Sequence, residues 1–218
     1  MSNSGDEKRI GRPPGADADR TRRAILDAAL RAFSERGFEG TSIREITGSV
    51  GVGHNMVRHY FGSKDDLWNA AVRHGLSPAA ERLTEMLDVR SADAPLRPTL
   101  RAALEVLMTE AAANPDAFRL FLSEALRGGP RFEQIYDDVL EPLSLAIVEY
   151  AAVTDEIPST VDLRVLGVFV FGAAFSPFTF EGFASRVGFA PPKSGEPVDG
   201  QVGQLIELIL TGMTQTGR

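Results

Sequence analysis

The chain has 218 residues, of which 43% are hydrophobic, so it is long enough to bury a sizeable core in one large domain or in two smaller ones. It has no cysteine, which excludes disulfide bonds and thiolate metal sites. The net charge of −7 argues by itself against a nucleic-acid partner. However, residues 1–67 carry 11 basic and 10 acidic side chains, so the acidity belongs to the C-terminal part.

The first segment, residues 1–18, is polar and rich in Pro and Gly, which is typical of disorder. It contains the basic run of residues 8–12, with the sequence KRIGR. An extended basic arm of this kind can enter a DNA minor groove, and a solvated tail can have the same composition. Both roles stay open for this arm.

A first helix is predicted over residues 20–36, with Asp19 as its N-cap and Gly37 at its end. A short second helix begins after Ser42, which forms a capping-box pattern with Glu45. Gly51 then allows the positive φ of a tight turn.

A third helix is predicted over residues 54–60, with its apolar side chains facing inward: Met56, Val57 and Tyr60. Ser63 caps a long fourth helix, which Pro78 is expected to kink or split. Further helices are predicted over residues 96–113, 115–128, 131–152, 161–186 and 199–214, with a loop over 188–200. The fold class is therefore all-α.

Three short helices with a Gly-containing turn before the third predict a helix-turn-helix, whose third helix enters the major groove. The exposed side of this helix offers hydrogen-bonding groups at His54, Asn55, Arg58 and His59. Asn pairs with adenine, and Arg pairs with guanine or phosphate. An ordinary surface helix can show the same pattern.

The segments TSIREI (41–46), VGV (50–52) and YFGSKDDL (60–67) resemble the DNA-binding domain of the tetracycline-repressor (TetR) family. Residues 22–29 and 35–38 are similar to the family's first helix. The resemblance implies a helix-turn-helix domain over 19–66 and a helical ligand-binding and dimerisation domain over 67–218. It also implies DNA contacts from Ser42 and Arg44, and a phosphate contact from Lys64.

Two positions depart from the family pattern. Gly53 stands where a capping Ser is common, and Arg58 stands where Tyr is usual. Glycine is an acceptable cap, so the first change costs only a few tenths of a kcal/mol. Arg58 keeps a phosphate or guanine contact available, but it puts a family-typical operator sequence in doubt.

The helix predicted from residue 161 onward is apolar on nearly every side and needs cover on every side. Together with the last helix it predicts a homodimer interface, as the resemblance also implies; burial within one monomer is the alternative. The predicted interface residues are Leu166, Phe169, Val170, Leu205, Ile206, Ile209 and Met213.

Aromatic and soft side chains spread over several helices predict a pocket for a small hydrophobic effector, although core packing explains them equally well. The predicted lining residues are Met108, Phe118, Phe121, Leu122, Tyr136, Phe171, Phe175 and Phe178. The resemblance implies that such an effector releases a repressor dimer from a pseudo-palindromic operator. A DNA-binding dimer with no ligand, or one controlled by a protein partner, is the alternative function.

An enzyme is not expected, because the sequence has no G-x-S-x-G, H-E-x-x-H or P-loop motif. Neither cofactor nor metal is expected, since His54 and His59 are five residues apart and lie on different sides of a helix. The longest uncharged stretch has 16 residues and includes Pro177, which is too short to span a membrane. With no secretory signal visible, we expect a cytoplasmic protein.

Overall fold

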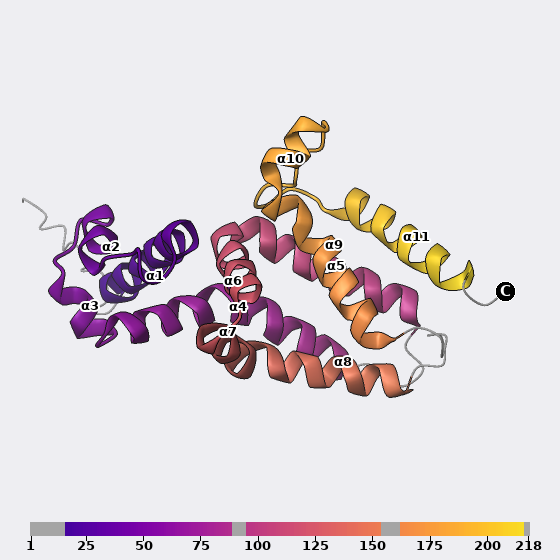
Figure 1. Ribbon diagram of the computed structural model, residues 1–218, viewed down its shortest axis with the longest axis horizontal. Coiled ribbons are helices and arrows are strands. Elements are labelled where there is room, and N and C mark those ends of the chain that lie inside the picture. Colours follow the sequence, from indigo (N-terminus) through magenta and orange to yellow (C-terminus); the bar gives the residue numbers. More distant parts are fainter. Residues whose placement is uncertain (1–15, 89–94, 154–161, 216–218) are drawn as a thin grey trace, which may run out of the picture.

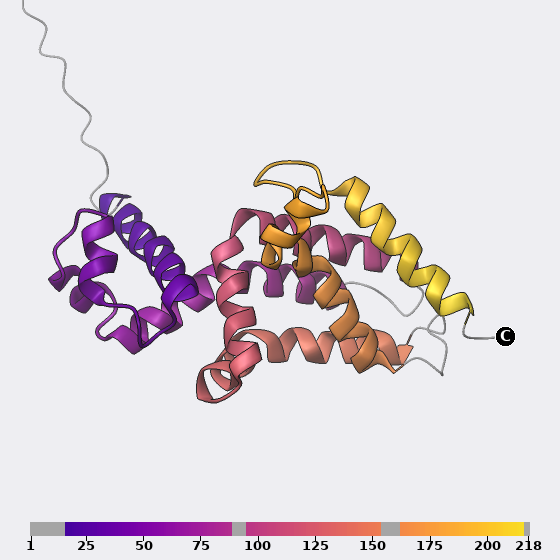
Figure 2. The same ribbon diagram turned by 45° about the horizontal axis from the view of Figure 1, so that its top comes forward.

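The computed structural model describes residues 16–88, 95–153 and 162–215, and within these ranges it contains helices and no strand. The all-α prediction is therefore confirmed. Figure 1 shows an elongated molecule, with the first three helices at one end and the last helix towards the other. The same separation is seen after a 45° turn in Figure 2. The end formed by the first three helices is called the N-terminal lobe, and the helices that follow form the body.

The N-terminal lobe consists of α1 (Ala16–Arg36), α2 (Ile43–Ser49) and α3 (Asn55–Tyr60). The predicted start of α1 was wrong: the helix already includes Ala16, so Asp19 lies in its first turn and is not its N-cap. An acidic residue in the first turn still complements the helix dipole. The lobe is held by a fully buried apolar core that includes Ile25, Phe33, Ile46 and Val57.

Helix α4 (Lys64–Asp88) joins the lobe to the body. Ser63 caps it as predicted, since Ser63 Oγ accepts the Asp66 N–H at 3.1 Å and the Ser63 N–H donates to the Asp66 carboxylate at 3.1 Å. Pro78 does not split the helix, which runs on unbroken around it. One helix therefore contributes to the cores at both ends of the molecule.

The body contains further helices, in chain order α5 (Leu96–Ala113), α6 (Pro115–Arg127), α7 (Pro130–Ile135), α8 (Glu141–Val153), α9 (Leu163–Thr179), α10 (Glu181–Arg186) and α11 (Asp199–Gln215). Helices α9 and α11 both pack on α5, and α8 packs on α4. Among the described helices, none combines the length and the hydropathy that crossing a membrane requires.

Two predicted helices of the body are divided in the structure. The helix predicted over 131–152 contains a π-helical turn, η1 (Tyr136–Leu140), between α7 and α8. There the Glu141 N–H bonds to the Tyr136 carbonyl five residues back, immediately before Pro142, which has no N–H to donate. The helix predicted over 161–186 breaks at Phe180, whose backbone leaves the helical region with ψ of 37°.

Candidate nucleic-acid interface and apolar cavity

The capping box predicted at the start of α2 is present. Ser42 Oγ accepts the Glu45 N–H at 3.2 Å, and the Ser42 N–H donates to the Glu45 carboxylate at 3.1 Å. The hydrogen bond from the Ser42 N–H to the carboxylate is the first cause of a lowered pKa of Glu45, relative to its ordinary value of 4.5, and the Ser42 side chain is the second. The buried Thr41 hydroxyl is 2.9 Å from the Ala32 carbonyl and 2.7 Å from the Gly37 carbonyl, so α2 is fixed firmly against α1.

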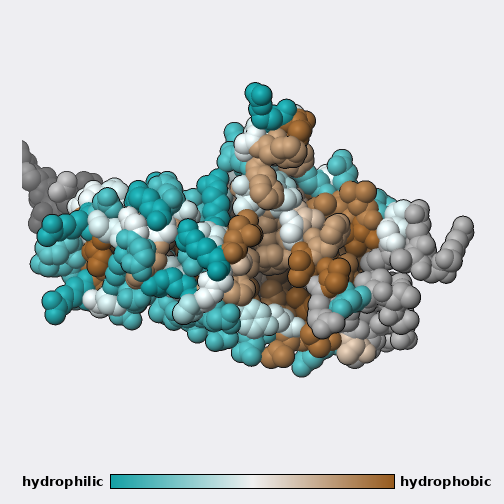
Figure 3. All heavy atoms as spheres, viewed as in Figure 1, coloured by the Kyte–Doolittle hydropathy of each residue, from teal (hydrophilic) through white to brown (hydrophobic). Residues whose placement is uncertain are grey.

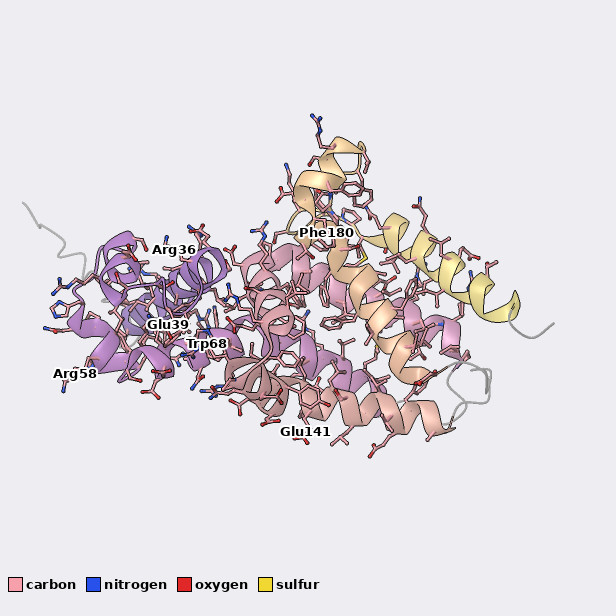
Figure 4. The ribbon with its side chains drawn as sticks, in the orientation of Figure 1. Arg36, Glu39, Arg58, Trp68, Glu141 and Phe180 are labelled. Carbon is pink, nitrogen blue, oxygen red and sulfur yellow. The ribbon has the colours of Figure 1, made fainter. Side chains whose placement is uncertain are left out.

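Helix α3 presents its polar side chains outward. Val57 is fully buried and anchors the helix, while Met56 and Tyr60 are half-buried against the lobe core. The four residues predicted to read DNA are all exposed: His54, Asn55, Arg58 and His59. Figure 4 shows Arg58 at the outer edge of the lobe, pointing away from the body. No acidic side chain interrupts this helix.

The two predicted contact residues around α2 are also exposed, namely Ser42 and Arg44. Lys64, at the start of α4, is half-buried instead, because its ammonium group lies 4.3 Å from the centroid of the Phe38 ring. A cation over an aromatic face is attracted by the negative face of the ring. Lys64 would therefore have to leave Phe38, or reach past it, to bind a phosphate.

The body contains an apolar cavity of about 130 Å³ between α4, α5, α8 and α9. Aliphatic side chains form most of its walls, with Thr99 and Tyr150 as the polar contributors and no charged side chain among the lining residues. The Thr99 hydroxyl is already bonded to the Pro95 carbonyl at 2.9 Å. Of the eight predicted pocket residues, Phe171 lines this cavity.

A smaller cavity of about 20 Å³ lies on the other side of Phe171, and four of the predicted residues line it: Phe118, Phe121, Phe171 and Phe175. These rings pack against one another, with centroids 4.5 Å apart for Phe118 and Phe175 and 5.3 Å apart for Phe121 and Phe171. Phe171 therefore separates the two cavities and is part of the wall of each.

The other four predicted pocket residues lie elsewhere. Met108 lines a groove of about 340 Å³ between α9, α10 and α11. Leu122, Tyr136 and Phe178 line none of these three hollows; Phe178 is buried and Tyr136 is exposed. The residues that line the 130 Å³ cavity and were missed include Leu83, Leu87, Leu100 and Tyr150. Leucines at helical spacing give no sign of whether they face a void or one another.

Among the residues predicted for a dimer interface, Phe169 is exposed, and Leu166 and Leu205 are half-buried. Val170, Ile206 and Ile209 are instead buried in this chain's own core, where α9 and α11 pack on α5. The Met213 side chain lies outside the described part of the chain. Apolar side chains that do reach the surface of these helices are Val165, Val168, Phe169 and Leu208. Figure 3 shows hydrophobic surface gathered on this side of the body, whereas the N-terminal lobe is mostly hydrophilic.

Residues 25–71 match the family model of the bacterial regulatory proteins of the tetR family. The chain is 33% identical to the HTH-type transcriptional regulator RutR of Escherichia coli (strain K12) over 131 residues, which are 60% of this chain and 58% of RutR. It is 25% identical to the HTH-type transcriptional repressor AcnR of Corynebacterium efficiens over 88% of this chain and 92% of AcnR.

The fold is similar to that of solved structures as well. The transcriptional regulator FadR of Bacillus subtilis, solved in complex with stearoyl-CoA, aligns over 87% of this chain and 98% of its own, with a TM-score of 0.62 and 15% identity. By contrast, the sequence matches to the RutR regulators cover less than two thirds of the length of each RutR chain. The matched residues 25–71 include the whole of α2 and α3 and most of α1, so the match to the tetR family of bacterial regulatory proteins covers the N-terminal lobe and the start of α4.

Proposed function

We propose that this chain is a transcriptional regulator that binds double-stranded DNA as a homodimer, and that a small neutral apolar molecule in the body releases it from its operator. The observation that carries the proposal is the two-sided character of α3. Val57 fixes the helix to the lobe core, while Asn55, Arg58 and His59 are exposed at the outer end of the molecule. A rigidly held helix with a polar outer side is what the major groove accepts.

Each exposed residue has a chemical role in this proposal. Asn55 has the amide geometry that pairs with the N6 and N7 edge of adenine, and Arg58 has the fork that pairs with guanine or phosphate. Ser42 and Arg44, at the start of α2, contact the DNA backbone. Lys64, at the start of α4, contacts a DNA phosphate. The Ser42 oxygen already accepts a hydrogen bond inside the capping box, so Ser42 contributes its O–H as a donor.

Dimerisation is attributed to the outer faces of α9 and α11. Val165, Val168 and Phe169 follow helical spacing on α9, and between 58% and 76% of each residue is exposed in the single chain. Leu208 on α11 is 70% exposed. Apolar patches of this kind mark association surfaces. Two copies joined here would present two α3 helices, which must lie about 34–36 Å apart to meet successive major grooves of a pseudo-palindromic site.

The nature of the effector follows from the cavity walls. Because none of the described residues that line the 130 Å³ cavity is charged, an ionised group placed there would lose its hydration with no partner among them to replace it. A dry apolar cavity of about 150 Å³ binds benzene in another protein, so this cavity suits a neutral molecule the size of one ring. The stearoyl-CoA in the Bacillus subtilis FadR structure is far larger and charged, so the likeness to that protein concerns the fold alone.

The test is selection of binding sites from random DNA duplexes by the full-length protein. The proposal expects an enriched sequence with two inverted half-sites about 10 bp apart, centre to centre. Asn55→Ala and Arg58→Ala should each lose or relax the preference at one position in each half-site, while Lys193→Ala, an exposed lysine on the loop before α11, should leave the selected sequence unchanged. If no sequence is enriched, or if the site has a single half, the proposal is wrong. If no neutral apolar compound changes DNA binding, control by a protein partner, or no control at all, becomes the better account.

A further inference from the structure

One side chain of the body, Arg131, contacts both the N-terminal lobe and the start of α4. The guanidinium carbon of Arg131, in the first turn of α7, lies 3.2 Å from the centroid of the Phe38 ring and 5.0 Å from that of Trp68. The same side chain donates a hydrogen bond to the Asp65 carboxylate at 3.1 Å. Phe38 follows α1, whereas Asp65 and Trp68 belong to the first turns of α4.

These contacts are partly shielded from water, which strengthens them. The Arg131 side chain is only 25% exposed and Trp68 is fully buried. A cation over an aromatic face is worth more where the cation is partly desolvated. Arginine is suited to this place because its flat guanidinium can stack on a ring while its N–H groups bond a carboxylate in the same plane. Arg131 therefore fixes α7 to the lobe at the junction where Figure 4 labels Trp68.

The next residue along α7 contacts the cavity wall. The Phe132 ring lies 6.3 Å from the Phe121 ring, and Phe121 lies 5.3 Å from Phe171, measured between centroids. Phe171 lines the 130 Å³ cavity directly. Successive residues of a helix point about 100° apart, so one turn of α7 contacts the lobe through Arg131 and the aromatic cluster through Phe132.

The turn that follows α7 is π-helical and interrupts the α-helical hydrogen-bond pattern. The π-helical turn η1 holds one residue more than an α-helical turn would, and it separates the short α7 from α8. Such turns occur often at functional sites. At its other end, α7 is preceded by Gly128 and Gly129, both with positive φ. The short helix that carries Arg131 is thus bounded by a pair of glycines on one side and by a π-helical turn on the other.

We propose that Arg131 is the positioning residue through which an occupied cavity changes the orientation of the N-terminal lobe. A molecule in the cavity presses on Phe171, the displacement passes through Phe121 to Phe132, and α7 turns so that Arg131 leaves Phe38 and Asp65. This proposal rests on the proposed function for its ligand and its DNA. Helix α6 also joins the body to α1, so the test must separate α7 from α6.

Trp68 supplies a direct readout, because it is the only tryptophan in the sequence and lies beside Arg131. Its indole N–H is buried with no hydrogen-bond partner among the described residues, so its emission should respond to a change in nearby charge. The probe is toluene, a neutral molecule with a single ring. In the full-length protein, binding of toluene, measured by calorimetry, should change the Trp68 emission and lower the affinity for the selected operator about fivefold or more.

The decisive variant is Arg131→Ala. It should bind toluene within twofold of the unchanged protein, yet show no toluene-dependent change in Trp68 emission and less than a twofold change in operator affinity. Arg131→Lys, which keeps the charge and loses the flat fork, should restore part of the response. Arg127→Ala is the matched control: Arg127 pairs with Glu124 at 3.4 Å and makes no cation–π contact with a ring of the described residues, so the response of this variant should be unchanged.

The outcomes separate the two proposals. If Arg131→Ala responds to toluene as the unchanged protein does, the coupling role of Arg131 is wrong and the proposed function stands. If Arg131→Ala and Arg127→Ala lose the response equally, a general loosening of the junction replaces the specific role. If toluene changes Trp68 emission through Arg131 but no operator is selected, the coupling stands and the DNA proposal fails. If toluene does not bind the unchanged protein, both the cavity ligand and the coupling are wrong.

Discussion

Gly75 of α4 and Ala117 of α6 touch so closely that a β-carbon on residue 75 would lie 2.5 Å from the Ala117 Cβ. The same β-carbon would lie 3.0 Å from a methyl group of Leu30 on α1. Three helices thus meet where the N-terminal lobe joins the body, and the absence of a side chain at residue 75 sets their spacing. The Ala117 Cβ is bonded directly to the backbone and cannot rotate away, so the crowding cannot be relieved without moving a helix.

Gly75→Ala should therefore destabilise the protein by about 1–3 kcal/mol, the usual cost of overpacking a filled core. Chemical denaturation of the full-length protein measures the change in the free energy of unfolding. The control is Gly48→Ala in α2, where an added β-carbon meets nothing within 4 Å and helix propensity favours alanine by up to about 1 kcal/mol. Equal effects at the two positions would contradict the close contact.

The capping box at α2 predicts a specific pH dependence of stability. Because the pKa of Glu45 is lowered in the folded chain, the folded state binds fewer protons than the unfolded state in the range just below 4.5. The stabilisation by Glu45 is thus complete above that pH and is lost as the pH falls through the lowered value. Glu45→Gln keeps a hydrogen-bond acceptor but cannot titrate, so its stability should fall less steeply as the pH is lowered below 4.5.

Thermal unfolding across that pH range measures the difference. Glu39→Gln, an exposed glutamate that takes no part in the capping box, serves as the control and should follow the unchanged protein. Parallel curves for Glu45→Gln and the unchanged protein would show that the carboxylate contributes nothing beyond a neutral acceptor.

The elements that depend on neighbours in the sequence were predictable. Ser42 with Glu45, and Ser63 at the start of α4, are local patterns whose hydrogen bonds reach three residues, and both are present. The inward position of Val57 followed from helical spacing in the same way. Contacts with distant parts of the chain were not predictable: the apolar stripe of α11 was assigned to a second copy of the chain, whereas α11 packs on α5, and nothing in the stripe distinguishes these two kinds of cover.

The junction between lobe and body shows the same limit. Arg131 is 93 residues from Phe38 and 66 from Asp65 in the sequence, and no spacing pattern joins positions so far apart. The aromatic residues of the body were expected to line a pocket, yet the rings of Phe118, Phe121, Phe171 and Phe175 pack against one another, and the larger cavity is lined mostly by aliphatic side chains. Where a core leaves a void depends on the sum of all side-chain volumes, which no single motif records.

DNA affinity should depend on both Arg58 and Lys64, in different ways. Arg58→Ala should cost about 1–3 kcal/mol of operator affinity and relax the preference at its base if it reads one. Lys64→Ala should weaken binding to all sequences and reduce the slope of log affinity against log salt by about 1, as expected for one lost phosphate contact. Fluorescence anisotropy with a labelled duplex at several salt concentrations measures both.

Lys64 has a second role that the experiment must separate, because its ammonium group lies over Phe38 in the free chain. Lys64→Arg should keep the charge on the ring and the salt slope, whereas Lys64→Met keeps the packing and loses the slope. A salt slope for Lys64→Ala identical to that of the unchanged protein would remove Lys64 from the phosphate contacts.

Substitutions on α9 and α11 should affect two different properties, the association state and the folding of the chain. Phe169 is 58% exposed, so Phe169→Asp should break the dimer and leave each monomer folded. Ile209 is 5% exposed inside the chain, so Ile209→Asp places an unpaired charge in the core and should unfold the body. Sedimentation gives the association state, and circular dichroism gives the helix content. A folded, stable dimer of Phe169→Asp would exclude this face of α9 from the interface.

The uneven charge of the chain has a consequence for how it meets DNA. Residues 1–67 are nearly neutral, while the remainder carries 12 basic and 20 acidic side chains and lies along the rest of a long molecule. Near a polyanion, the acidic body is repelled more strongly than the N-terminal lobe. This uneven repulsion favours orientations in which α3 faces the DNA. The chain would thereby rotate towards a productive orientation before contact. The effect weakens at higher ionic strength, because salt shortens the Debye screening length.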